Sequence, residues 1–378
     1  MNMIARRIRD LVHQCALLGL IFLSSAPLYS QSTEALPPVV PIAGTQLLHL
    51  TSSIVNQEYD LYINLPRGYS DTTKRFPVIY HLDAQWDFPL VQSIYGQQYF
   101  DGFLPAAIVV GITWGGMNPN HDSLRARDLT PTNSRQQPQS GGGQKFLKAI
   151  KTEVIPFVDS KFRTLPQDRT LMGSSLGGLF TLFAMFQEPG LFNRYVLTSP
   201  SIGWDNGFLY RLEKEYASTH SNLQARLYVG IGGFEVTSLA EFDKFISVLK
   251  ARSYPGLDMN TQVIQGVGHS GGKAEGYTRG LQAVFAKPAV GLSPEVLKSY
   301  IGKYRVGGLA IIEATEEKGG VTIVMPGNLK IPLLAESKDH FYVKGMFLLV
   351  TFTRGKEGQI SGLELDTYNG KQVAERIN

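Results

Sequence analysis

Short apolar segments alternate with segments of helical periodicity between residues 46 and 288. The apolar segments include FPVIYHLD, AAIVVGI, RTLMG, RYVLTSP, RLYVGIG and TQVIQG, and the intervening segment KFLKAIKTEVIPFVDSKF has apolar residues at helical spacing. Strands that are covered by helices on both faces of a parallel sheet are apolar along their whole length. The alternation therefore predicts an α/β fold with a mostly parallel sheet and helices on both faces.

The pattern changes in residues 289–378. Strand-like segments such as VTIVM, FLLVTFTR and ISGLELDTY follow one another closely, separated by turn-forming segments such as EKGG, MPGN and GKEG. Glycine, asparagine and proline favour tight turns, and no helical segment separates these strands. This region predicts a small antiparallel β-barrel or β-sandwich domain.

Residues 1–32 have the pattern of a secretory signal peptide. A cationic start, MNMIARRIRD, precedes an apolar stretch from Cys15 to Leu23 and a small-residue region, SSAPLYSQS. The apolar stretch is shorter than the roughly 20 residues that a membrane span needs, although an uncleaved anchor is the alternative. Residues 33–45 are proline-rich and predict a linker. We expect an exported bacterial protein, periplasmic or secreted, without a transmembrane segment after cleavage.

Composition and charge exclude several classes of function. The predicted signal peptide contributes half of the formal net charge of +4, so no large basic surface for nucleic acid is expected. Cys15 is the only cysteine, which leaves the exported chain without a disulfide or a cysteine metal site. The glycines at 140–143 lack the Lys-Ser/Thr pair of a phosphate-binding loop. We expect no metal and no cofactor.

The stretch TLMGSSLGGLF, residues 170–180, contains Gly-x-Ser-x-Gly centred on Ser175. An apolar strand precedes the pattern and an apolar helix follows it, as in the nucleophile elbow of α/β-hydrolases. The amides at the start of such a helix favour a developing oxyanion. Ser174 does not fit the pattern, because Met172 and Leu176 occupy the places of the two glycines. Ser175 is therefore the predicted nucleophile.

A serine nucleophile needs a histidine base, which follows it in the chain order of α/β-hydrolases. Of the three histidines after Ser175, His220 lies in a polar segment and His340 lies in the predicted β-domain. His269 follows a predicted strand in the glycine-rich loop VGHSGG. His269 is therefore the predicted base.

The base needs a carboxylate that orients it. Glu235 lies a few residues after the predicted strand RLYVGIG, at the level where such an acid is expected. Glu241 and Asp243, in the helical stretch that follows, are the alternatives. Glu235 is the predicted acid.

Several segments together resemble the "putative esterase" family of α/β-hydrolases. In chain order they are TSSIVNQEYDLYINLPRGY, PVIYHLDAQWDF, ARDLTPT, GSSLGGLF, LTSPSIGWD, VGIGGFE and GVGH. The family includes esterase D, enterobactin-type siderophore esterases, feruloyl and acetyl-xylan esterases, and mycolyltransferases. The siderophore-esterase branch is the most similar. The tail, entered at YIGKYR, resembles a small β-domain that follows some bacterial serine hydrolases.

The resemblance implies the α/β-hydrolase fold, and it implies roles for individual residues. It assigns the catalytic roles to the serine, the histidine and the acid predicted above. It also implies an oxyanion hole formed by the amide of Leu176 and by one amide from the loop LDAQW, which Ala84 or Gln85 would supply. The family usually has glycine where this loop has Ala84.

Five side chains are candidates for contacting the substrate. Three of them, Trp114, Arg125 and Arg127, lie in the long segment GITWGGMNPNHDSLRARDLTPT. Trp86 lies in the predicted oxyanion loop, and Trp204 lies in PSIGWDNG. Aromatic rings and guanidinium groups bind aromatic or anionic groups by stacking, cation–π contact and paired hydrogen bonds. The alternative is that Arg127 pairs with Asp128 and that the tryptophans pack.

Together these expectations predict that the protein is a secreted serine esterase. The serine attacks a carboxylic ester, backbone amides hold the oxyanion, and water releases the acyl group. A small-molecule or glycan ester is the expected partner, of the siderophore-lactone or acylated-glycan type. Two alternatives stay open: an acyltransferase with a carbohydrate acceptor, and a catalytically silent protein that binds a siderophore or a glycan. The oligomeric state does not follow from the sequence.

Overall fold

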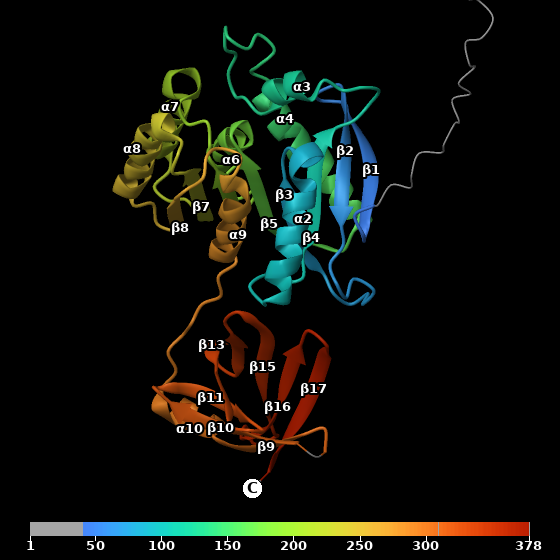
Figure 1. Ribbon diagram of the computed structural model, residues 1–378, viewed down its shortest axis with the longest axis vertical. Coiled ribbons are helices and arrows are strands. Elements are labelled where there is room, and N and C mark those ends of the chain that lie inside the picture. The colour runs from blue at the N-terminus through green and yellow to red at the C-terminus, as the bar shows by residue number, and fades with distance from the viewer. Residues whose placement is uncertain (1–40, 309, 378) are drawn as a thin grey trace, which may run out of the picture. The chain divides into compact units, whose positions relative to one another are not determined.

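The computed structural model describes residues 41–308 and 310–377 (Figure 1). The predicted signal peptide, residues 1–32, and most of the predicted linker, residues 33–45, lie outside the described residues. In the described part of the chain, none of the helices has the length and apolar character that crossing a membrane requires.

The first sheet has eight strands in the order β1-β2-β4-β3-β5-β6-β7-β8. β1 and β2 pair antiparallel, as do β2 and β4, and all other neighbours are parallel. Every residue of β3 and β4 is buried, because helices cover both faces of these strands. The mostly parallel sheet confirms the predicted α/β architecture. The strands are β1 (Thr45–Ser52), β2 (Gln57–Asn64), β3 (Phe76–His81), β4 (Ile108–Trp114), β5 (Thr164–Ser174), β6 (Arg194–Thr198), β7 (Ala225–Gly232) and β8 (Leu257–Ile264).

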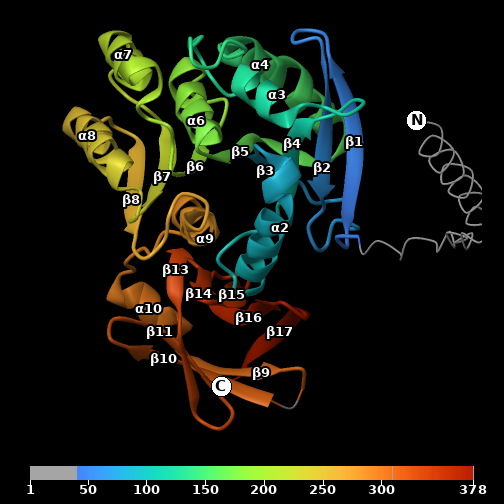
Figure 2. The same ribbon diagram turned by 45° about the horizontal axis from the view of Figure 1, so that its top comes forward.

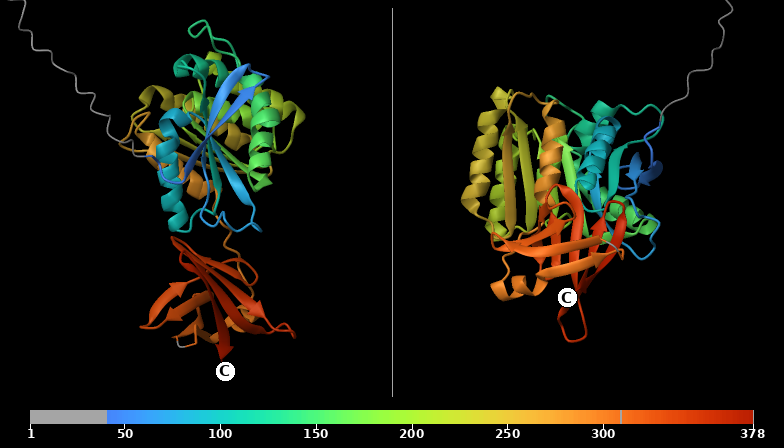
Figure 3. Two further views of the ribbon diagram at one scale, coloured as in Figure 1. Left: turned by 90° about the vertical axis from the view of Figure 1, so that its right-hand side faces the viewer. Right: turned by 60° about the horizontal axis from the view of Figure 1, so that its bottom comes forward.

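Helices lie on both faces of this sheet (Figures 2 and 3). α2 packs against α9 on one face, and α6 packs against α7 on the other. Most of these helices begin shortly after a parallel strand ends, so their N-termini gather at the carboxyl edge of the sheet, where ligands of α/β folds bind. The helices are α2 (Ala84–Phe100), α3 (His121–Asp128), α4 (Gly143–Ala149), α5 (Ile155–Lys161), α6 (Leu176–Gln187), α7 (Trp204–Thr219), α8 (Val236–Arg252) and α9 (Gly272–Val284).

The helix predicted for the segment KFLKAIKTEVIPFVDSKF contains one wider turn. α4 continues through a π-helical segment, Ile150–Val154, into α5. Pro156 stands in the first turn of α5, where its missing N–H removes an ordinary helical hydrogen bond. The apolar face keeps its predicted direction across this turn, since Phe146 and Val158 are both buried.

The second sheet has nine strands, all antiparallel, in the order β12-β11-β10-β9-β17-β16-β15-β14-β13. Its two edge strands are consecutive in the chain, and Leu333 between them donates its N–H to Val321 O of β11. The sheet therefore curls into a nearly closed barrel (Figure 3), which decides between the predicted barrel and sandwich. Its elements are α10 (Pro294–Tyr300), β9 (Gly302–Val306), β10 (Ala310–Glu317), β11 (Gly320–Met325), β12 (Leu329–Pro332), β13 (Leu334–Ser337), β14 (His340–Val343), β15 (Met346–Arg354), β16 (Ile360–Thr367) and β17 (Gly370–Ile377).

Aromatic side chains occupy the core of this barrel. Tyr300, Tyr304, Phe341 and Phe352 are all buried in one cluster. The ring of Phe352 lies with its centroid 4.5 Å from that of Tyr300 and 5.4 Å from that of Phe341. Small barrels are commonly filled by side chains in this way. The cluster forms a packed core.

Candidate active site

Ser175 lies in the sharp turn between β5 and α6. It is the N-cap of α6, with φ 59° and ψ −116°, a conformation that is strained for a residue with a side chain and that occurs at functional sites. Its N–H donates to Thr198 O at 3.1 Å, and Ser201 N–H donates to Ser175 O at 3.1 Å. These two bonds hold the strained turn against β6 and the loop after it, as in a nucleophile elbow.

Two glycines make this turn sterically possible. A Cβ on Gly173 would lie 2.7 Å from the carbonyl of Gly177, and a Cβ on Gly178 would lie 2.9 Å from Pro200. Both distances are too short for carbon, so any side chain at either place would push α6 away from the strand or from the next loop. The glycines around Ser175 therefore reflect close backbone packing.

Glu235 and His269 lie together although 34 positions separate them in the chain. His269 Nδ1 is 2.6 Å from Glu235 Oε2. Glu235 Oε1 accepts hydrogen bonds from the hydroxyl of Ser199 and, at 2.9 Å, from the N–H of Gly232. The side chain of Glu235 is 10% exposed and that of His269 is 47% exposed. The carboxylate is thus held at both oxygens while the imidazole is open to a substrate.

Backbone contacts join the loop after β7, which carries the acid, to the loop after β8, which carries the histidine. Phe234 N–H donates to Val267 O at 2.9 Å. A Cβ on Gly232 would lie 2.7 Å from Gly268 O, so only glycine allows the two loops to approach this closely. The contact between Glu235 and His269 therefore depends on the backbone contacts between the two loops that carry them.

The hydrogen bonds to Glu235 keep it ionised. Burial opposes its charge, but the bonds from Ser199, from His269 and from the N–H of Gly232 outweigh burial and hold the pKa of Glu235 below its ordinary value. The carboxylate is therefore charged at neutral pH. A charged acid is what stabilises an imidazolium during acyl transfer.

The other histidines that follow Ser175 lie elsewhere. The ring of His220 stacks on Tyr216 with a centroid distance of 4.2 Å, and His340 lies in β14 of the barrel. Among the described residues, Glu235 is the side chain that hydrogen-bonds to His269, and it does so at Nδ1. Catalytic hydrogen bonds to a serine commonly tighten only when substrate binds.

Two helix N-termini meet at one place on the sheet edge. β3 and β5 are parallel neighbours, and Leu82 N–H donates to Met172 O at 3.0 Å where the two strands end. Within the described structure, the amides of Ala84, Gln85 and Leu176 have no hydrogen-bond acceptor. Free amides at neighbouring helix starts are suited to bind an oxyanion. The three predicted donors are thus placed on two adjacent turns.

Arg125 of α3 links these two turns. Its Nε and Nη2 donate to the carboxylate oxygens of Asp83 at 2.8 and 2.9 Å, and Nη2 also donates to Ser174 O at 3.2 Å. Asp83 is almost fully buried and has a left-handed φ of 59°. One guanidinium therefore contacts the residue before Ala84 and the residue before Ser175, which makes Arg125 a positioning residue. The expectation that Arg125 contacts substrate is therefore corrected, because its guanidinium is engaged by Asp83, a partner 42 positions away that the sequence did not indicate.

A second ion pair, between the first turns of α2 and α9, was also missed. Lys273 Nζ lies 2.9 and 3.0 Å from the two carboxylate oxygens of Asp87. The buried hydroxyl of Tyr277 donates to the same carboxylate at 3.1 Å. α2 follows the predicted oxyanion loop, and α9 follows the loop that carries His269. The ion pair therefore connects the helices that follow these two loops. No local pattern marks a pair whose members are 186 positions apart.

His81, the last residue of β3, predicts a pH dependence of stability. It is buried, and burial lowers its pKa to about 4. Because an unfolded histidine titrates near ~6.5, the unfolded state binds more protons between these two values, and stability falls as pH falls through this window. Between pH 7 and pH 4 we expect the free energy of unfolding to drop by about 3 kcal/mol more in the wild type than in His81→Gln. Urea unfolding followed by circular dichroism measures this difference, and parallel pH profiles would contradict it.

Two predicted substrate contacts are engaged inside the protein. Trp114 is 3% exposed, and its Nε1 donates to Asp128 Oδ2 at 2.7 Å. Tyr59 OH donates to the same oxygen at 2.6 Å, and Arg127 pairs with Asp128 through Nε at 2.7 Å and Nη2 at 3.0 Å. These donors saturate a fully buried carboxylate, which would otherwise be costly to bury. The expectation that Trp114 contacts substrate is therefore corrected, and the fork of Arg127 is already occupied.

The other two predicted contacts stay accessible. Trp86 is 50% exposed, and its ring centroid lies 6.4 Å from that of His121 and 5.8 Å from the guanidinium carbon of Arg125. Trp204 is half-buried at the start of α7, and its Nε1 donates to Thr132 Oγ1 at 3.0 Å. Both lie next to predicted catalytic loops and stay predicted substrate contacts.

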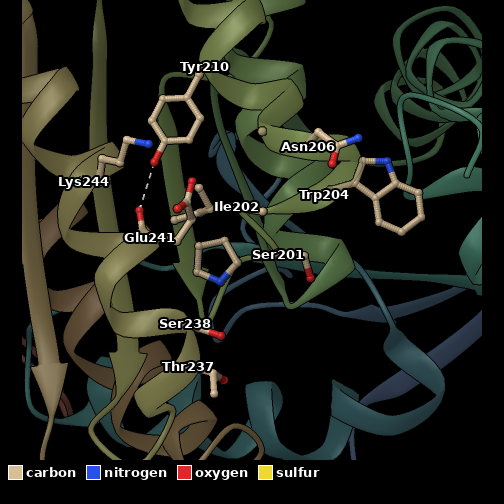
Figure 4. A pocket seen from close by; sticks show the side chains of 12 residues that line it. Ser201, Ile202, Trp204, Asn206, Tyr210, Thr237, Ser238, Glu241 and Lys244 are labelled. Atoms are coloured by element: carbon tan, nitrogen blue, oxygen red, sulfur yellow. Dashed lines mark hydrogen bonds between the residues drawn. The ribbon is translucent and has the colours of Figure 1, made fainter.

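A cavity of about 650 Å³ lies between the loop after β6, the start of α7 and the first turns of α8 (Figure 4). Trp204, Tyr210, Glu241 and Lys244 surround it. Glu241, one of the alternative acids, is thus part of a cavity wall, and the other alternative, Asp243, is exposed on α8. We call this space the α7–α8 cavity.

Residues 52–238 match the family model described as "Putative esterase". Through this segment, slightly less than half of the chain, the protein is similar to that esterase family. Ferri-bacillibactin esterase BesA of Bacillus subtilis is 30% identical over 190 residues, which cover 47% of this chain and 65% of the relative. The siderophore triacetylfusarinine C esterase of Aspergillus fumigatus is 28% identical over 189 residues, which cover 48% of this chain and 64% of that relative. The chain thus spans slightly less than two thirds of the length of these two relatives.

A solved structure shares the fold. An IroE-like serine hydrolase from Shewanella oneidensis has a TM-score of 0.56 and 26% sequence identity, and the match covers 64% of this chain and 80% of that chain. This likeness confirms the α/β-hydrolase fold that the esterase motifs predicted.

Proposed function

We propose that this chain is a serine esterase that hydrolyses carboxylic esters, of the siderophore-lactone type, through Ser175, His269 and Glu235. The observation that carries the proposal is the 2.6 Å contact between His269 and Glu235 at the sheet edge where Ser175 forms a strained elbow. A protein that only binds a ligand needs neither the strain nor the buried acid. The names of two relatives, both siderophore esterases, support the substrate type.

In this proposal each of the three residues has one role. Glu235 accepts the Nδ1 proton of His269 in a hydrogen bond and so makes Nε2 the basic nitrogen. Nε2 removes the hydroxyl proton of Ser175 as its oxygen attacks the ester carbonyl, and then returns that proton to the leaving alcohol. An acyl-enzyme remains on Ser175. Water, deprotonated by the same nitrogen, releases the acid.

Backbone amides stabilise the tetrahedral intermediate in this proposal. The negative oxygen lies between the amide of Leu176 and an amide of the loop after β3, from Ala84 or Gln85. Removal of one such donor typically raises the barrier by ~3 kcal/mol. The bonds from Arg125 to both turns keep these donors at a fixed separation.

Covalent labelling tests the proposal. The purified protein is treated with a fluorophosphonate, and its peptides are analysed by mass spectrometry while p-nitrophenyl acetate and an enterobactin-type trilactone are assayed. We expect one label, on the peptide that contains Ser175, and loss of turnover in proportion to labelling. Turnover that survives complete labelling, or a label on another residue, would contradict the mechanism. Recovery of the acyl group on an added sugar instead of as free acid would indicate acyl transfer. Export stays a prediction from the sequence of residues 1–32.

A further inference from the structure

We propose that the hairpin of β1 and β2, at one edge of the first sheet (Figure 1), binds a divalent transition-metal ion, with zinc as the best fit. Its ligands are His49, Glu58 and Asp60. One donor atom from each of these side chains lies within 4.8 Å of the other two. An imidazole nitrogen with two carboxylate oxygens is a ligand set that zinc accepts. The site contains none of the proposed catalytic residues, so the proposal does not depend on the esterase activity.

The register of the hairpin explains why the three side chains meet. Glu58 and Asp60 are two positions apart in β2, so their side chains project from the same face of the sheet. His49 of β1 is the cross-strand partner of Asp60, and such partners project from one face with their Cβ atoms about 5 Å apart. Two alternate residues of one strand and one residue of the next strand thus form a triangle. The backbone ladder sets its dimensions, as a preorganised metal site requires.

The neighbouring strand leaves room beside the two carboxylates. Gly115 directly follows β4, and its N–H donates to Glu58 O at 2.9 Å. A Cβ on Gly115 would lie 3.0 Å from Glu58 Oε1 and would overlap Asp60 Oδ1. Both carboxylates therefore turn toward a position that has no side chain. Any residue other than glycine would fill the space in which they converge.

The negative charge of this cluster is not balanced by the protein. In the part of the chain that the structure describes, neither Glu58 nor Asp60 forms an ion pair with a lysine or an arginine, and Asp60 pairs only with His49, whose Nδ1 lies 2.8 Å from Asp60 Oδ1. Neighbouring carboxylates repel each other, and a divalent cation between them removes this repulsion. The side chain of His49 is 62% exposed and that of Asp60 is 20% exposed, so an ion can reach them from solvent.

The ligand set selects among metals. Three protein ligands and one water complete the four-coordinate geometry of an open zinc site, whereas Mg²⁺ and Ca²⁺ prefer oxygen ligands alone. Zinc bonds of about 2.1 Å require donor atoms roughly 3.4 Å apart in a tetrahedron, so we expect the side chains to close slightly around the ion. The sequence predicted no metal, because the register that pairs His49 with Asp60, 11 positions away, is not visible in it.

Isothermal titration calorimetry with ZnCl₂ tests the site. The protein is purified without a polyhistidine tag, and metal is removed with EDTA, which is then dialysed away. We expect one tight zinc site per chain, with an affinity at least about 100-fold higher than for Mg²⁺ or Ca²⁺, whose chlorides are titrated in parallel. Absence of zinc binding, or equal affinity for zinc and Mg²⁺, would overturn the proposal.

Matched variants locate the ion. His49→Gln and Asp60→Asn each remove one ligand and should weaken zinc binding by about 10-fold or more. His340→Gln changes an exposed histidine of the barrel, and His269→Gln changes the histidine that contacts Glu235. Both should leave zinc binding unchanged. Wild-type zinc affinity in His49→Gln, with its thermal midpoint intact, would refute the assignment. Loss of binding in His269→Gln instead would overturn it in favour of an ion at the proposed active site.

Discussion

Replacement of Ser175 by alanine is expected to lower kcat for ester hydrolysis by ~10³-fold or more. Ser175 is the N-cap of α6, and in the proposed mechanism its hydroxyl oxygen forms the bond to the acyl group, which alanine cannot do. The strained backbone is held by its hydrogen bonds to Thr198 and Ser201, which do not involve the side chain. The variant should therefore fold, and hydrolysis of p-nitrophenyl acetate together with the thermal midpoint measures both properties.

The neighbouring serine provides the matched control. Ser174 is buried, and its Oγ has no hydrogen-bond partner in the described structure. Ser174→Ala removes only this unpaired hydroxyl, so kcat should stay near the wild-type value and stability should not fall. An inactive Ser174→Ala beside an active Ser175→Ala would reverse the assignment of the nucleophile. Full activity in both would remove serine catalysis from the proposal.

Replacement of Arg125 by methionine is expected to have the largest effect on stability. It leaves the buried carboxylate of Asp83 without its partner, and loss of one member of a buried ion pair typically costs ~3–5 kcal/mol. The substitution also removes the hydrogen bond from Arg125 Nη2 to Ser174 O, which links the turn before Ala84 to the turn before Ser175. We expect kcat to fall more than KM rises, because an oxyanion hole acts mainly on the transition state. Urea unfolding and steady-state kinetics measure the two effects.

Two further variants separate charge burial from positioning. Arg135→Met changes an exposed arginine and should alter neither stability nor kcat. The double variant Asp83→Asn/Arg125→Met removes both buried charges, so it should regain part of the lost stability. It should not regain kcat, because the link to Ser174 O is still missing. A double variant with wild-type kcat would show that Arg125 only neutralises Asp83.

The fold could be predicted because its signals are local. Strands covered on both faces are apolar along their length, as all residues of β3 and β4 are, and this pattern is legible without knowledge of their neighbours. The nucleophile elbow is equally local, since the Gly-x-Ser-x-Gly pattern describes contacts within one turn. The π-helical segment Ile150–Val154 was not predicted, because the apolar spacing around it resembles that of an ordinary helix.

The acid and the substrate contacts were less predictable. Three carboxylates after β7 suited the role of the acid, and only the pairing of two loops through Phe234 and Val267 places Glu235 beside His269. The sequence predicts Trp114 as a substrate contact because it does not show that Asp128 lies within reach of the indole Nε1. A long polar segment does not reveal which of its side chains point inward.

Local sequence patterns were sufficient to predict the α/β architecture, the small antiparallel β-domain at the end of the chain and the elbow that carries Ser175 between β5 and α6. These features depend on residues within one element or one turn, where residues that are close in the sequence are also close in the structure. The tertiary structure decided which acid meets His269, which arginine joins the two turns of the predicted oxyanion hole, and which polar groups face the α7–α8 cavity. These contacts join residues 31 to 49 positions apart, and their geometry exists only once the strands are ordered in the sheet.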